Sequence, residues 1–152
     1  MTWLFKNVTL VDRNLPLTSD KVDVLISEGI ISAIGVNLIA PDAKVIAMED
    51  LHVSIGWMDI GASHGDPGEE HRESLLSLRA TAAAGGFTTL APWPDTHPRV
   101  DNKAAIYYLT QLNQLEAVEI FPIASLSEKG EGKEMANLWI CIKREPLAFQ
   151  MA

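Results

Sequence analysis

The first part of the chain consists of short apolar runs broken by turn residues. Residues 2–12, TWLFKNVTLVD, are rich in β-branched and aromatic side chains, which favour a strand. Glu28-Gly29, between two further apolar runs, is typical of a hairpin. Closely spaced short strands therefore predict a small all-β unit, a sandwich or an open barrel, over residues 1–54. The predicted strands cover residues 2–12, 22–27, 30–34 and 44–48.

From residue 55 the pattern changes, because the apolar runs no longer alternate with polar residues and helical segments separate them. Leu75, Leu78 and Ala82 recur at helical spacing in a segment without proline or glycine. Strands of this kind are typical of parallel sheets covered by helices. The predicted strands cover 56–60, 87–93 and 117–124, and the predicted helices cover 69–84, 102–115 (with Asp101 as N-cap) and 135–142.

The second part, residues 55–152, is thus predicted to contain about three βα units of an α/β fold. A parallel sheet of three strands has open edges. Residues 146–150 are the one further strand candidate after the last predicted helix. We therefore expect this part to be an incomplete fragment of a larger architecture.

The composition narrows the functional classes. The chain has 152 residues, a net charge of −8 and no cluster of more than two neighbouring Lys or Arg. Nucleic acids and anionic membranes need a basic surface, so neither is expected as a partner. No apolar stretch is long enough to span a membrane. The single cysteine, Cys141, excludes an internal disulfide and a cysteine metal site, and a cytoplasmic location is expected.

The candidate chemistry gathers in one stretch, residues 56–102, which holds three of the four histidines. Polar segments follow the predicted strands after Ile60, Ala91 and Ser125. Because the carboxyl ends of parallel strands meet at one edge of a sheet, these segments are expected to lie together.

Six runs of residues carry a family resemblance. They are GWMD at 56–59, DPG at 66–68, EHRE at 70–73, AAAGGFTT at 82–89, PWPDTHPRVDN at 92–102 and FPIASLSEKGEGKEMANL at 121–138. In combination and spacing they resemble dihydroorotases, the cyclic amidohydrolases of pyrimidine biosynthesis within the metal-dependent amidohydrolase superfamily. The resemblance implies the start of a (β/α)₈ TIM barrel preceded by a small β-sandwich, with the chemistry at the carboxyl ends of the barrel strands.

The resemblance also implies a zinc site. Dihydroorotases hydrolyse a ring amide with water activated by metal, and the first two ligands come from an Asp-x-His-x-His run. In a strand, residues two apart lie on one face, so both imidazoles reach the same ion. Here Asp59 holds the aspartate position, but the histidine positions are Gly61 and Ser63. We therefore expect no zinc to bind.

Two residues remain as candidate ligands, Asp59 and His64. His64 is one residue out of register with the family histidine, so a continuing strand would turn it to the opposite face, and a structural role is expected. His71 is expected to cap or pack at a helix start, and His52 and His97 to lie in loops.

The substrate positions also differ from the family pattern. The family arginine that grips the substrate carboxylate is replaced by Gly65. The family asparagine after the second strand is matched by Asp95, which is either a substrate-binding residue or a turn residue.

The leading interpretation is a dihydroorotase-like protein. The family reaction is hydrolysis of dihydroorotate to carbamoyl aspartate and its reverse. This chain is expected to be inactive, because the two histidines and the later barrel strands are missing. Two alternatives stay open: a non-catalytic scaffold partner of aspartate carbamoyltransferase, or a truncated, non-functional fragment. A homo-oligomer is also possible on this pattern.

Overall fold

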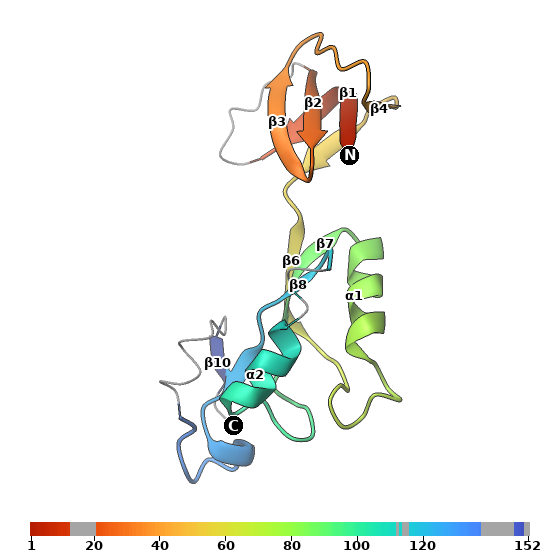
Figure 1. Ribbon diagram of the computed structural model, residues 1–152. Coiled ribbons are helices and arrows are strands. Elements are labelled where there is room, and N and C mark those ends of the chain that lie inside the picture. Colours follow the sequence, from red (N-terminus) through yellow and green to blue (C-terminus); the bar gives the residue numbers. More distant parts are fainter. Residues whose placement is uncertain (13–20, 112, 114–115, 138–147, 151–152) are drawn as a thin grey trace. The chain divides into compact units, whose positions relative to one another are not determined.

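The computed structural model describes residues 1–12, 21–111, 113, 116–137 and 148–150. The chain forms two compact units, Met1–Ile55 and Gly56–Ala152, and each is described by itself (Figure 1). Strands and helices both occur, which confirms the predicted α/β class. In the described ranges, no helix is long and apolar enough to cross a bilayer.

The first unit is a mixed sheet with the strand order β3-β2-β1-β4, in which β5 also pairs with β1. The strands are β1 (Thr2–Val11), β2 (Val22–Ser27), β3 (Ile30–Gly35), β4 (Lys44–Ala47) and β5 (His52–Ser54). β1 is antiparallel to β2 and parallel to β4 and β5. Over the described residues these strands all pair into one sheet, and the assignment of residues 1–54 as a β-sandwich unit stays a prediction. The pattern did not predict β5, which contains His52.

The hairpin between β2 and β3 forms at the predicted residues. Glu28 and Gly29 both have positive φ, 52° and 81°. A two-residue turn with positive φ at both positions matches the twist of the flanking strands. Ser27 consequently pairs with Ile30 across the turn.

A buried carboxylate holds the first unit together. Asp23 is 2% exposed and accepts hydrogen bonds from the backbone N–H of Asn7 at 3.0 Å and of Leu38 at 2.9 Å. Lys6 forms an ion pair with the same carboxylate. Burial by itself raises the pKa of Asp23, but the hydrogen bonds from Lys6 and the two amides outweigh it, so the pKa lies below its ordinary value.

The second unit contains a parallel three-stranded sheet in the order β6-β7-β8 (Figure 1). Its strands are β6 (Trp57–Ala62), β7 (Phe87–Pro92) and β8 (Glu119–Ile120). Helix α1 (Leu75–Ala84) connects β6 to β7, and α2 (Lys103–Thr110) lies between β7 and β8. The buried core contains Leu75, Ala82, Leu90, Val100, Ile106, Leu109, Val118, Ile120 and Ala124. Two βα units of the predicted kind are thus present.

The prediction for the first helix was wrong at its start. α1 begins at Leu75, not at residue 69, and no acidic residue lies in its first turn. The hydroxyl of Ser74 caps it by accepting the N–H of Ser77, at 3.2 Å. Residues 65–73 are instead closed into a loop by hydrogen bonds between Gly65 and the backbone of Glu69 and Glu73.

The cap of the second helix also differs from the prediction. The side chain of Asn102, not that of Asp101, accepts the N–H groups of Ala104 and Ala105, at 3.0 and 3.1 Å. Both caps supply an acceptor for amides that the helix leaves unpaired.

The third predicted strand is broken in two. Pro122 has no backbone N–H, and the segment divides into β8 and β9 (Ile123–Ser125) on either side of it. β9 pairs in parallel with β10 (Ala148–Gln150). After β9 comes the short 3₁₀ turn η2 (Glu128–Gly130). Of the predicted helix at 135–142, residues 135–137 are not helical and the remainder lies outside the described residues.

Candidate functional site

The strand exit of β6 contains a bulge at Gly61. Ile60 pairs with Ala91 and Ala62 pairs with Pro92, so Gly61 is an extra residue without a partner on β7. Its φ is +102°, a conformation that side chains other than glycine rarely adopt. The prediction of which face residues 61, 63 and 64 point to assumed that side chains alternate regularly along the strand. The bulge interrupts that alternation.

The indole of Trp93 fills the space in front of Gly61. A Cβ built on Gly61 would lie 2.8 Å from Nε1 and 2.9 Å from Cε2 of that indole. The backbone N–H of Trp93 donates to the carbonyl oxygen of Ala62 at 3.0 Å, which fixes the two strand exits to each other. The space that a side chain at position 61 would fill, the predicted place of the first family histidine, therefore contains an aromatic ring from the neighbouring strand exit.

The loop after β6 leaves no room for a side chain at Gly65. The N–H of Gly65 donates to the carbonyl oxygen of Glu73 at 2.9 Å, and its own carbonyl oxygen accepts the N–H of Glu69. A Cβ on Gly65 would overlap the carbonyl oxygen of Glu69. Because this obstacle is backbone, an arginine at position 65 would require the loop itself to move.

The loops after β6 and β7 also touch each other. The N–H of His97 donates to the carbonyl oxygen of Pro67 at 3.1 Å. Gly68, with φ +104°, approaches so closely that a Cβ there would overlap the carbonyl oxygen of His97. Gly65 thus permits the first loop to fold tightly on itself, and Gly68 permits it to pack against the second loop.

Asp66 connects this loop to both helices. Its Oδ1 accepts the hydroxyl of Tyr108 in α2 at 2.6 Å, and its Oδ2 accepts the N–H of Leu75 at the start of α1 at 3.2 Å. The hydrogen bond to Asp66, together with desolvation, raises the pKa of Tyr108 to about 12. Tyr108 therefore stays protonated, and a donor to Asp66, to a higher pH than an ordinary tyrosine.

His64 is buried, with 6% of its surface exposed. Neither ring nitrogen makes a hydrogen bond of good geometry, but the backbone of Asp66 and of Trp93 lies close to the ring and favours its charged form. Burial lowers the pKa of His64, while the nearby Asp66 opposes that shift only partly. The imidazole is therefore held neutral inside the loop, which agrees with a structural position, although its role as a ligand stays a prediction.

Curated proteins with a sequence similar to this chain include dihydroorotases. No protein-family model matches the chain. The dihydroorotase of Aquifex aeolicus (strain VF5) is 31% identical over 147 residues, which are 96% of this chain and 35% of that protein. The dihydroorotase of Citrifermentans bemidjiense is 34% identical over 140 residues, 91% of this chain and 33% of that protein. The chain is a dihydroorotase homologue. It spans about one third of the length of these curated relatives.

Solved structures show the same fold in this homologue. The L-hydantoinase from Arthrobacter aurescens superimposes with a TM-score of 0.73 at 21% identity, over 96% of this chain and 32% of the other. A D-hydantoinase gives a TM-score of 0.65 at 28% identity, over 84% of this chain and 28% of the other. The predicted architecture, part of an amidohydrolase barrel, is thereby confirmed.

The residues of this dihydroorotase homologue do not fit the metal that the family implies. Gly61 offers no donor atom, and Ser63 is exposed just beyond the end of β6. Asp59 lies exposed in β6, and His64 is buried in the loop. Within the described ranges, no three His, Cys, Asp or Glu side chains come together in a way that could hold an ion.

Asp95 lies at the surface of the loop after β7. Its Oδ1 accepts Nη1 of Arg99 at 2.9 Å, and both side chains are at least one third exposed. The pair lies within one loop, which fits the interpretation of Asp95 as a turn residue. Its role in substrate binding stays a prediction.

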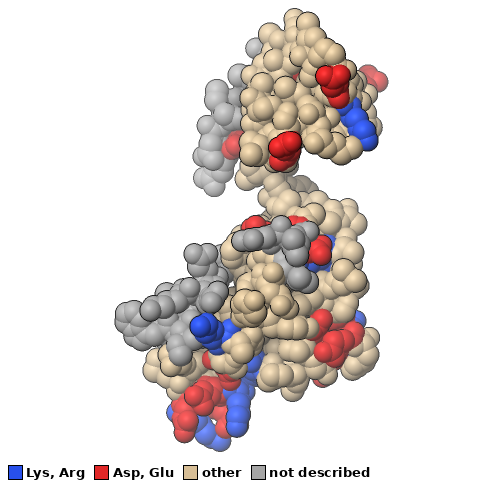
Figure 2. Space-filling model, in the orientation of Figure 1, with Lys and Arg blue, Asp and Glu red and all other residues tan. Residues whose placement is uncertain are grey.

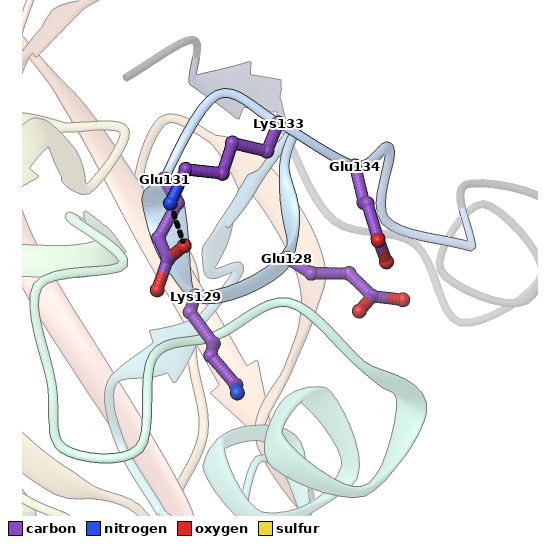
Figure 3. Close-up of a pocket in the computed structure, with 5 residues that line it drawn as sticks. All are labelled: Glu128, Lys129, Glu131, Lys133 and Glu134. Carbon is purple, nitrogen blue, oxygen red and sulfur yellow. Dashed lines mark hydrogen bonds and ion pairs between the residues drawn. The ribbon is translucent and has the colours of Figure 1, made fainter.

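The loop after β9 forms a small polar hollow, drawn in Figure 3. The residues that line it are Glu128, Lys129, Glu131, Lys133 and Glu134. Lys133 pairs with Glu131 at 3.0 Å, and both side chains are well exposed. Acidic and basic side chains are likewise interspersed on the face of the second unit in Figure 2. Exposed pairs of this kind contribute little to the stability of the fold.

Sequence reasoning missed two residues that shape this site, Trp93 and Tyr108. A signal for the first was present in the chain, since an aromatic residue between two prolines directly follows β7. Nothing in the sequence pattern indicates that Tyr108 reaches Asp66, because the two are brought together by the packing of α2 against the loop.

Proposed function

We propose that this dihydroorotase homologue is a non-catalytic member of the family. The observation that carries the proposal is the strand exit of β6, where Gly61 has no donor and Trp93 fills the space in front of it. Hydrolysis of a ring amide at neutral pH needs an activated water, which the family obtains from its metal. Without that group, hydrolysis of dihydroorotate and closure of carbamoyl aspartate are both expected to be lost.

The loop at Gly65 supports the same proposal from the substrate side. A guanidinium that pairs with a carboxylate through two hydrogen bonds is a strong anchor for an anionic substrate. At position 65 the backbone of Glu69 leaves no room for such a side chain. The carboxylate of dihydroorotate would therefore lack this anchor.

The test is turnover by the purified chain. Both directions of the reaction are assayed with dihydroorotate and with carbamoyl aspartate, with and without added zinc. The dihydroorotase of Aquifex aeolicus serves as the positive control. We expect no turnover in any condition and no zinc retained after dialysis, whereas zinc-dependent turnover that a chelator abolishes would refute the proposal.

A second candidate function is that of a scaffold for aspartate carbamoyltransferase. It is favoured by a strand exit that is well folded without the family's ligands, since Gly61 and Gly65 are both packed closely against neighbouring groups. In the described sheet, β6 has β7 as its one neighbour, so Ile60, which is 65% accessible, is a residue at which a partner contact can be tested. The single cysteine suits a reducing compartment, so we place this role in the cytoplasm.

Sedimentation of a mixture with aspartate carbamoyltransferase tests the scaffold role. We expect co-sedimentation with the native chain and weaker association with Ile60→Ser. Leu76→Ser is the matched control, because it removes an exposed leucine (73% accessible) from α1. Self-association without the transferase would favour a homo-oligomer, and aggregation of the chain alone would favour the non-functional fragment.

A further inference from the structure

We propose that Trp93 is a metal-excluding residue, whose indole prevents any side chain from being accommodated at position 61. This inference rests on the proposed function and deepens it. The missing histidines are one reason why the chain would not bind the metal, and the indole of Trp93 is a second. Restoring histidine at 61 and 63 would then not restore a metal site while Trp93 is present.

The distances carry the first step. A Cβ on Gly61 would lie 2.8 to 2.9 Å from Nε1, Cε2 and Cζ2 of Trp93. Atoms of this kind are in favourable contact at about 3.5–4.0 Å. Even a methyl group at position 61 therefore requires the indole to move, and an imidazole requires far more space.

The backbone of Trp93 has little freedom to make that movement. It lies between Pro92 and Pro94, which are both among the most fully buried side chains. Each proline ring fixes its own φ. The hydrogen bond from Trp93 to Ala62 ties the same residue to the end of β6. Side-chain rotation is thus the main way in which the indole could leave.

Because φ of Gly61 is positive, any substitution there also strains the backbone. A second glycine with positive φ allows this backbone strain to be measured separately from the collision with the indole. Gly86, in the same unit, has φ +82° with nothing within 4 Å of a built Cβ. Alanine at 86 introduces the backbone strain alone, whereas alanine at 61 introduces strain and the collision with the indole. The difference between the two variants measures the collision.

A double-mutant cycle tests this step. We compare the melting temperatures of Gly61→Ala, Trp93→Ala and the double variant with the same set built on Gly86→Ala. We expect Gly61→Ala to melt lower than Gly86→Ala, and Trp93→Ala to recover part of the loss at 61 and none at 86. Additive effects at position 61 would overturn the proposal. Trp93→Leu replaces Trp93→Ala if the smaller side chain prevents folding.

A zinc titration tests the consequence for metal. Gly61→His/Ser63→His is compared with the same variant carrying Trp93→Ala, in competition with a chromogenic zinc indicator. We expect the triple variant to bind zinc at least about tenfold more tightly than the double variant. Equal binding by the two, or binding by neither, would overturn the proposal. Neither experiment reads catalysis, so a failure here is distinct from turnover by the native chain.

Discussion

The hydroxyl of Tyr108 donates to Oδ1 of Asp66 at 2.6 Å and joins α2 to the loop after β6. The other oxygen of the same carboxylate accepts the first amide of α1, at Leu75. One buried side chain thus fixes the relative positions of the loop and of two helices. This hydrogen bond supplies no catalytic or metal-binding group, but it fixes the loop that follows β6.

Tyr108→Phe is expected to lower the free energy of unfolding by about 1–2 kcal/mol, because a buried carboxylate loses a charge-assisted hydrogen bond. Urea unfolding measures this change. In the native chain, ultraviolet titration should find one tyrosine that ionises near the raised pKa of about 12. Loss of that late step in Tyr108→Phe identifies the residue, and an unchanged titration would contradict the assignment.

The burial of neutral His64 predicts a dependence of stability on pH. The pKa of His64 is lowered in the folded state, so the unfolded state takes up more protons as the pH falls below the ordinary value of 6.5. Stability is therefore full above this pH and is lost progressively below it, towards the folded pKa.

The measurement is the melting temperature of the native chain and of His64→Gln between neutral and mildly acid pH. The native chain should lose stability faster than His64→Gln over this window. His97→Gln is the matched control, because that side chain is 76% exposed. Equal slopes in the native chain and in His64→Gln would show that His64 is not the titrating group.

Asp23→Asn is expected to cost the first unit about 2–3 kcal/mol, because it removes the charge that Lys6 and two backbone amides stabilise. The lowered pKa of Asp23 gives the native chain stability that is present above its ordinary value of 3.8 and is lost as the pH falls through the folded pKa. Asp42→Asn, at an exposed position, is the control. Acid unfolding should be steeper in the native chain than in Asp23→Asn.

Asn102→Ala is expected to cost about 1 kcal/mol, because two amides at the start of α2 lose their acceptor. Asn102→Ser keeps an oxygen at the cap and should recover most of the loss. Asp101→Ala removes the acceptor of the Lys129 N–H but leaves the cap of α2 in place. The helical circular dichroism signal should therefore fall in Asn102→Ala and not in Asp101→Ala, and the reverse would contradict the observed cap.

Local patterns predicted the elements whose limits are set locally. The prediction of a hairpin at Glu28-Gly29 was correct because the turn depends on those two residues only. The start of α1 was misplaced because Asp66 and the bonds between Gly65 and Glu73 draw the preceding segment into a loop. These contacts join residues that are separated in the sequence, so the helical spacing of the apolar residues does not indicate them.

The same limit applies to the candidate site. The absence of histidine at 61 and 63 can be read directly from the chain, since Gly61 has no side chain and Ser63 carries only a hydroxyl. The ring that occupies the resulting space comes from the next strand exit, so only the pairing of β6 with β7 reveals it. The bulge at Gly61 likewise shifts the alternation used to orient His64, which periodicity within one strand cannot foresee.

The contact between Gly61 and Trp93 also bears on how this chain could change over evolutionary time. A return of histidine at position 61 would meet the indole, and loss of the indole first would leave an unfilled space beside the strands. Each single substitution is then unfavourable, although the two together are compatible. Selection for stability would accordingly oppose the return of histidine at position 61, whichever of the two substitutions came first.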